Sequence, residues 1–219
     1  MSDTLTSTPT SSLEELQDLG VFTGMGDIWM AVITKAETPI TAAEYGTPQL
    51  IAEGVSFGIT PEYAEGSLSA SDRTIRKRRM PTGYTIKIEY PRIKAAVRAY
   101  LLGHAVDAKG GALLSDADSP YVAIGYSANR DSGKPVLRWL YKVKFSEQTV
   151  EDKTAEDGAI DYRIPVLEGN AVRCDNTVTL ADGRKVRPLR YDADLEDPAC
   201  TWTEETFFEA VPQYAAEAA

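Results

Sequence analysis

The chain has 219 residues, 43% of them hydrophobic, and a formal net charge of −10. This length and apolar content are enough for one domain with its own core, whereas the acidic balance argues against unspecific binding to nucleic acid or to an anionic membrane. No apolar stretch approaches the roughly 20 residues that a membrane-spanning helix requires. Residues 1–12 lack both the basic start and the apolar run of a signal peptide. We therefore expect a protein that is made and folded in a cytoplasm.

Residues 1–19 are predicted to form a flexible N-terminal arm. The first twelve are rich in Ser and Thr and poor in apolar side chains, so they cannot bury enough surface to fold alone. Three leucines between residues 13 and 19 add a short amphipathic stretch. Residues 213–219 are predicted to be a C-terminal tail. The domain itself is expected to span residues 20–212.

The first predicted strand covers residues 28–33. Every side chain in this range is apolar, which is typical of a central strand or of one covered on both faces. A turn is predicted at residues 45–48, Tyr-Gly-Thr-Pro. Residues 55–59 then alternate apolar and small side chains, as expected for another strand.

Residues from about 61 to 82 are predicted to form a long inter-strand loop, because Pro81 and Gly83 end the segment and a strand pattern resumes only afterwards. Nucleic-acid binding would require interleaved aromatic side chains and a basic domain, and the sequence has neither. Two interpretations of the basic run in this loop stay open: a solvated loop, or a candidate inter-subunit contact used for self-complementary docking. The basic side chains of the run are Arg73, Arg76, Lys77, Arg78 and Arg79.

Two later segments have the clearest strand patterns. Residues 84–90 and 137–145 alternate aromatic or β-branched side chains with mostly charged ones, which predicts one apolar and one charged face for each strand. Residues 121–126 form a shorter, more buried run, and residues 160–164 repeat the alternation. A late hairpin is predicted at about 176–190, because an Asp-Gly pair separates two alternating segments and glycine accepts the positive φ of a tight turn.

One helix is predicted at about residues 91–102. Its apolar side chains recur at the spacing of a single helical stripe, with Pro91 at its start and Gly103 just past its end. A second, shorter helix is predicted at residues 204–210, with Thr203 as its N-cap. The alternation of strands and helices that builds parallel sheets is missing. The expected fold is therefore mainly β (α+β): a β-sandwich of two antiparallel sheets with one packed α-helix.

Side chains that could carry chemistry are scarce. The single histidine, His104, follows the end of the predicted helix, where a polar C-terminal cap is the simpler interpretation. Cys174 and Cys200 have no metal-ligand or CxxC spacing, and two free thiols are expected. The acidic clusters at residues 116–118 and 192–197 lack the central glycine and the distant glutamate of a calcium loop. We expect no catalytic site, no metal site and no cofactor.

Nine segments, spread over roughly residues 20–212, carry a family likeness through their order and spacing. They are residues 45–48, 55–62, 101–103, 106–107, 111–114, 120–125, 139–146, 164–169 and 203–212. Taken together, these segments resemble the major tail tube proteins of long-tailed, non-contractile phages and prophages. The basic run at residues 73–79 departs from the family pattern.

The resemblance implies a structural virion protein without enzymatic activity. Its subunits would form hexameric rings of β-sandwiches, stacked into a hollow tube through which DNA passes without being specifically bound. The implied partners are further copies of the chain, a tape-measure protein, and tail terminator and tail-tip proteins, with no membrane involved. The protein would be assembled in the host cytoplasm and located in the tail of the virion.

An alternative is a carbohydrate-binding β-sandwich module used for virion decoration or host attachment. Such a module needs aromatic side chains on an exposed loop or face, but those of the clearest strands are expected in the core. A hydrolase with paired carboxylates is a third interpretation, which has only the abundance of acidic residues in its favour. The aromatic residues expected in the core are Tyr84, Tyr90, Trp139 and Tyr141.

Overall fold

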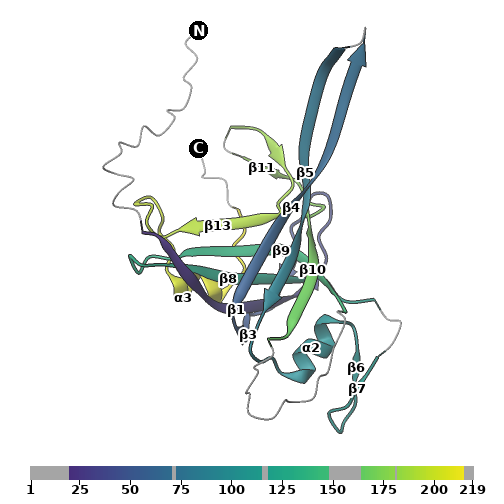
Figure 1. Cartoon of the computed structure of the whole chain (residues 1–219), viewed down its shortest axis with the longest axis vertical. Helices are drawn as coiled ribbons and strands as arrows, with labels where there is room; N and C mark the ends of the chain where they lie inside the picture. Colours follow the sequence, from purple (N-terminus) through teal and green to yellow (C-terminus); the bar gives the residue numbers. More distant parts are fainter. Residues whose placement is uncertain (1–19, 71–72, 115–117, 148–163, 181, 215–219) are drawn as a thin grey trace, which may run out of the picture.

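A computed structural model describes residues 20–70, 73–114, 118–147, 164–180 and 182–214 (Figure 1). The predicted N-terminal arm, most of the C-terminal tail and most of the predicted strand at residues 160–164 lie outside these ranges. The elements, in chain order, are β1 (Phe22–Lys35), β2 (Glu44–Tyr45), β3 (Gln49–Glu53), β4 (Ser56–Ala70), β5 (Arg73–Glu89), α2 (Ala95–Leu101), β6 (Ala105–Val106), β7 (Ala112–Leu113), β8 (Val122–Arg130), β9 (Val136–Ser146), β10 (Val166–Val172), β11 (Val178–Thr179), β12 (Lys185–Val186), β13 (Arg190–Asp194) and α3 (Glu204–Glu209).

Nine strands pair into one large antiparallel sheet. Seven follow the order β2-β1-β8-β9-β10-β5-β4, while β3 pairs with β1 and β13 pairs with β9. The short pairs β6–β7 and β11–β12 stand apart from this sheet, and the second of them is the hairpin around Gly183, whose φ is 79°. The fold is therefore mainly β with a large antiparallel sheet, as predicted. The nine strands of the large sheet form one connected ladder, so the predicted sandwich of two sheets is not confirmed.

Strand β9 divides the sheet, because it pairs with β8 along one edge and with two different strands along the other. β13 pairs with residues 136–140 of β9, and β10 pairs with residues 143–146. On the edge that pairs with β8, the pairs Val122–Val143 and Ile124–Leu140 leave one extra residue on β9. Such a bulge shifts the side-chain alternation by one position.

The shift places the apolar side chains of β9 in two cores on opposite faces of the sheet. The prediction of one apolar and one charged face for residues 137–145 is therefore wrong, because it assumed unbroken alternation. The α2 core contains Ile28, Met30, Ile86, Ile88, Tyr90, Leu101, Leu102, Val122, Ile124, Leu140, Val143, Phe145 and Leu167. The α3 core contains Ala31, Ala123, Leu137, Trp139, Tyr141, Cys174, Ala193, Phe207, Phe208 and Val211.

The α3 core is closed by the C-terminal segment. Trp139 is fully buried, and its indole Nε1 donates a hydrogen bond to the carbonyl of Phe207 at 3.1 Å. The hydroxyl of Tyr141 donates to the carbonyl of Pro212 at 2.8 Å. These two bonds satisfy the polar ends of buried aromatic side chains, as burial requires. The predicted cap of α3 is confirmed, since Thr203 forms a capping box at its N-terminus.

Helix α2 is shorter than predicted and begins at Ala95 instead of Pro91. The amide of Tyr90 still donates to the carbonyl of Pro165 at 3.3 Å, so residues 91–94 are needed to connect the sheet to the helix. At the other end, Gly103 has a φ of 75° and the amide of His104 donates to the carbonyl of Ala99 at 2.8 Å. This geometry ends a helix with a left-handed glycine.

Gly125 of β8 lies directly across the ladder from Trp139, and a Cβ at this position would lie 2.7 Å from the indole ring. We therefore expect Gly125→Ala to lower the free energy of unfolding by about 1–3 kcal/mol through overpacking. Gly24→Ala in β1 is the matched control, because a Cβ there has nothing within 4 Å. Urea unfolding of both variants measures the difference, and equal stabilities would contradict the close packing of Trp139 on Gly125.

Candidate assembly surfaces

β4 and β5 continue beyond the sheet as a two-stranded ribbon, here called the ribbon (residues 63–70 and 73–81). β10 pairs with β5 only as far as Gly83, and beyond that point β4 and β5 pair with each other. The ribbon projects away from the body (Figure 1). Eight residues at about 3.3 Å each give it a length of about 26 Å.

The ribbon has little support from its own molecule. Its described side chains, those of residues 63–67 and 77–81, are all exposed. A two-stranded ribbon is at best marginally stable in water unless another layer covers it. A long ribbon of this kind is therefore typical of a surface that docks on a partner.

The prediction of a long loop at about 61–82 is wrong, because most of this segment is strand. The pairs Glu62–Gly83 and Tyr63–Pro81 leave Thr82 as an extra residue on β5. Proline cannot donate a ladder hydrogen bond and is tolerated next to such a bulge. Pro81 and Gly83 therefore mark an irregularity within a strand and not the end of a loop.

All five predicted contact residues lie on the ribbon. The strand positions of Arg73 and Arg76 are opposite Ala70 and Leu68. Arg79 and Lys77 approach the same carboxylate, that of Glu65, with N–O distances of 3.0 and 3.9 Å. The guanidinium of Arg79 also lies 3.8 Å from the centre of the Tyr63 ring. On this face of the ribbon, the cations of Lys77 and Arg79 are therefore paired with the carboxylate of Glu65.

Arg78 lies on the other face of the ribbon. Its cross-strand partner is Gly66, and the neighbouring pair on this face is Ala64 and Met80. Arg78 is exposed and forms no ion pair with another residue that the structure describes. Met80 is 38% exposed. This face presents a cation beside small and apolar side chains, a combination that suits a partner with acidic and apolar groups.

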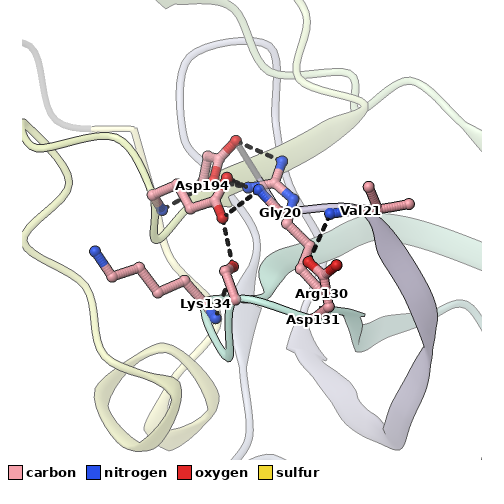
Figure 2. Close-up of polar contacts among 8 residues, drawn as sticks. Gly20, Val21, Arg130, Asp131, Lys134 and Asp194 are labelled. Atoms are coloured by element: carbon pink, nitrogen blue, oxygen red, sulfur yellow. Dashed lines mark hydrogen bonds and ion pairs between the residues drawn. The ribbon is translucent and has the colours of Figure 1, made fainter. Parts of the chain in front are cut away.

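A second polar site fixes the start of the described chain (Figure 2). Arg130, at the end of β8, has a side chain only 10% exposed. Its Nη1 and Nη2 donate to both carboxylate oxygens of Asp194 at 2.7 and 2.9 Å, and Nη1 also donates to Glu196 at 2.6 Å. Bidentate guanidinium–carboxylate contacts of this kind are strong and specific in geometry.

The same cluster holds Gly20 and Val21. The amide of Gly20 donates to Glu196 at 2.9 Å, and the amide of Val21 donates to Asp131 at 2.8 Å. The hydroxyl of Ser132 also donates to Glu196. The position at which residues 1–19 join the domain is therefore fixed by contacts to the β8–β9 turn and to the segment after β13.

Sequence reasoning did not identify this cluster. In the sequence, Asp194 and Glu196 stand out only as part of an acidic cluster without a calcium-loop motif, and nothing local shows that Arg130, more than sixty positions away, lies beside them. The hydrogen bond from Arg130 lowers the pKa of the Asp194 carboxyl below its usual value. The hydrogen bond from Ser132, helped by the amide of Gly20 and by Arg130, lowers the pKa of Glu196. Both carboxyls are thus held in the ionised form.

The expected burial of the strand aromatics holds for three residues. Tyr90, Trp139 and Tyr141 are 2%, 0% and 4% exposed. Tyr84 is the exception: it is half-buried and lines a hollow of about 420 Å³ with Phe57, Tyr126 and other residues.

The rings of this hollow offer little open face for a sugar. Phe57 and Tyr126 stack on each other with a centroid distance of 4.0 Å, and Tyr126 is only 3% exposed. The guanidinium of Arg190 lies 5.3 Å from the centre of the Tyr84 ring. Stacking with a carbohydrate would require these contacts to be displaced.

The remaining candidate side chains are one histidine and two cysteines. His104 follows α2, and its Nε2 is 4.0 Å from the carboxylate of Glu147. Cys174 and Cys200 are both free, and burial raises the pKa of the Cys174 thiol to about 12. Within the described ranges, no three His, Cys, Asp or Glu side chains gather in a way that could hold a metal ion. None of the helices described there is long and apolar enough to cross a membrane.

Replacing Arg130 with Leu is expected to lower the free energy of unfolding at pH 7 by about 2–3 kcal/mol, because two carboxylates lose their charged partner. A carboxyl with a lowered folded-state pKa contributes stability above its unfolded pKa of about 4 and loses it as the pH falls through the folded-state value. The gap between wild type and variant should therefore shrink below about pH 4. Urea unfolding at several pH values measures this gap.

Arg184→Leu is the control for this prediction. Arg184 is 74% exposed and pairs with Asp182 on the surface, and exposed pairs contribute about 1 kcal/mol or less. A gap for Arg130→Leu that is as small as for the control, or that does not change with pH, would contradict the role of the cluster.

Comparison with protein-family models and with curated proteins gives no match for this chain.

Proposed function

We propose that the chain is a subunit of a phage tail tube, a structural virion protein that assembles into stacked hexameric rings. The single observation that carries this proposal is the ribbon, about 26 Å long, which pairs only within itself beyond Gly83. The sequence resemblance to major tail tube proteins and the mainly β fold support it. In this proposal the body is a β-sandwich, with the strands on the two sides of β9 acting as its two sheets.

Self-assembly also accounts for the open edges of the sheet. β4 ends the strand order and has β5 as its only described neighbour, while the short strands β2 and β3 end the order on the other side. Open edges normally promote uncontrolled association. A closed ring removes this hazard, because each open edge is covered by a neighbouring subunit.

The net charge suits a conduit for DNA. Six copies at −10 each give a ring with a formal charge of −60. Where part of this charge faces the lumen, repulsion keeps the DNA backbone from binding as it passes. In this proposal the tape-measure protein occupies the lumen before ejection, and terminator and tail-tip proteins close the two ends. The protein acts in the virion tail without enzymatic activity.

Purified protein at high concentration is expected to form rings or tubes of uniform width. The reason is that the ribbon and the sheet edges gain stability only when a second copy covers them. Negative-stain electron microscopy and sedimentation velocity over a range of concentrations provide the measurement. Particles that stay monomeric up to millimolar concentration would refute the tail tube, and binding to immobilised glycans by such a monomer would favour the carbohydrate-binding alternative.

Reversing a charge of the ribbon should weaken assembly. Arg78→Glu reverses the cation that forms no described ion pair within the ribbon and so replaces attraction to a partner by repulsion, and salt screens both. We expect the concentration needed for assembly to rise about tenfold or more at 50 mM salt and by less at 500 mM. Light scattering at the two salt concentrations measures the effect. Arg184→Glu, a charge reversal on the late hairpin, is the control, and an equal effect of the control would remove the specific role of the ribbon.

A further inference from the structure

A groove of about 540 Å³ lies between β1, the turn before β3 and helix α3. Its floor is aromatic: the rings of Trp29 and Phe208 stack with a centroid distance of 5.4 Å and an interplanar angle of 9°. Phe208 is buried and Trp29 is half-buried. No Lys or Arg lines the groove among the described residues. The rim of the groove is formed by the exposed carboxylates of Asp27, Glu204, Glu205 and Glu209. The rim and the aromatic floor together are here called the acidic groove.

Two of these carboxylates are explained by the stability of α3, and two are not. Glu204 and Glu205 lie in the first turn of the helix, where negative charge is favourable. Glu209 is its last residue, where negative charge is unfavourable, and the last turn contains no basic residue. Asp27 lies across the β1–β3 ladder from Glu53, and facing like charges destabilise a sheet. Glu53 pairs with Arg92 at 3.4 Å, so Asp27 is the one of the two that has no described cation. A partner of opposite charge would compensate for both positions.

None of the four carboxylates forms an ion pair with another residue in the part of the chain that the structure describes. Exposed carboxylates around a half-buried tryptophan form a suitable receptor for an arginine. The guanidinium group can stack on the indole ring while its N–H groups donate to the carboxylates. The acidic groove therefore selects a cationic and partly apolar partner.

The ribbon carries the matching groups. Its face with Arg78, Met80, Ala64 and Gly66 combines one cation without a described ion-pair partner with a long apolar side chain and two small residues. The small residues allow the ribbon backbone to approach a surface closely. The ribbon as a whole contains five basic residues, which is unusual in a chain with a net charge of −10, and the cation on this face is complementary to the rim of the acidic groove.

We propose that the acidic groove receives the ribbon of a second copy of this chain, with Arg78 at the level of Trp29. This proposal rests on the tail tube function and names the contact that would hold two subunits together. The ribbon and α3 lie on different sides of one molecule, well separated in Figure 1, so a ribbon does not fill the groove of its own chain. The contact is therefore head-to-tail, the type that builds closed rings or continuing stacks.

Charge exchange between two variants tests the contact. The groove variant is Asp27→Lys with Glu209→Lys, two changes expected to preserve the fold because they remove unfavourable charges from a ladder and from a helix end. The ribbon variant is Arg78→Glu. Each variant alone should require about tenfold or more protein for assembly than wild type. An equimolar mixture should recover assembly, because the glutamate introduced at position 78 then meets the lysines introduced at positions 27 and 209, while Arg78 of the groove variant meets the unchanged acidic rim of the ribbon variant.

The outcomes separate this contact from the tail tube function. Asp118→Lys with Glu147→Lys makes the same change in charge at exposed carboxylates outside the acidic groove and should assemble normally. Thermal unfolding of each variant confirms that it is folded. If wild type assembles and the groove variant assembles equally well, or if the mixture fails to recover, the contact is refuted while the tail tube stands. A wild type that stays monomeric refutes both.

Discussion

The structure depends on the bulge in β9. If β9 alternated without this bulge, its odd-numbered apolar side chains from Leu137 to Phe145 would all lie on one face, and only Leu140 would lie on the other. With it, the first half of β9 packs Leu137 and Trp139 against the C-terminal segment, and the second half packs Val143 against the α2 side. The same strand pairs with both β13 and β10 along the edge opposite β8. One irregular position therefore sets both cores and the division of the sheet.

Local patterns in the sequence were sufficient for features that depend on neighbouring residues. Continuous apolar character over residues 28–33 predicted a strand covered on both sides, and Ile28 and Ala31 indeed lie in different cores. Thr203 predicted the start of α3 because an N-cap acts within one turn. The late hairpin likewise contains the glycine with positive φ on which its prediction depended.

Features that depend on distant residues could not be predicted in this way. The bulge in β9 is defined only by its pairing with β8, so alternation within the strand gave the wrong faces. Pro81 and Gly83 resembled the end of a loop, although they accompany a bulge that the opposite strand accommodates. Arg130 meets Asp194 and Glu196 only because β8 and β13 both pair with β9. In each of these cases the structure depends on a residue or strand that is distant in the sequence, and the local pattern does not show which one it is.

The ribbon leaves the body on one side only (Figure 1), and this has a consequence for any assembly that uses it. A filament built from such subunits has polarity: at one end the terminal subunits expose uncovered ribbons, and at the other end they expose vacant receptors. The two ends are chemically different, so each would require its own capping protein, and growth at the two ends would proceed at different rates. In the proposed assembly, the direction of elongation would thus follow from the asymmetry of the single folded chain.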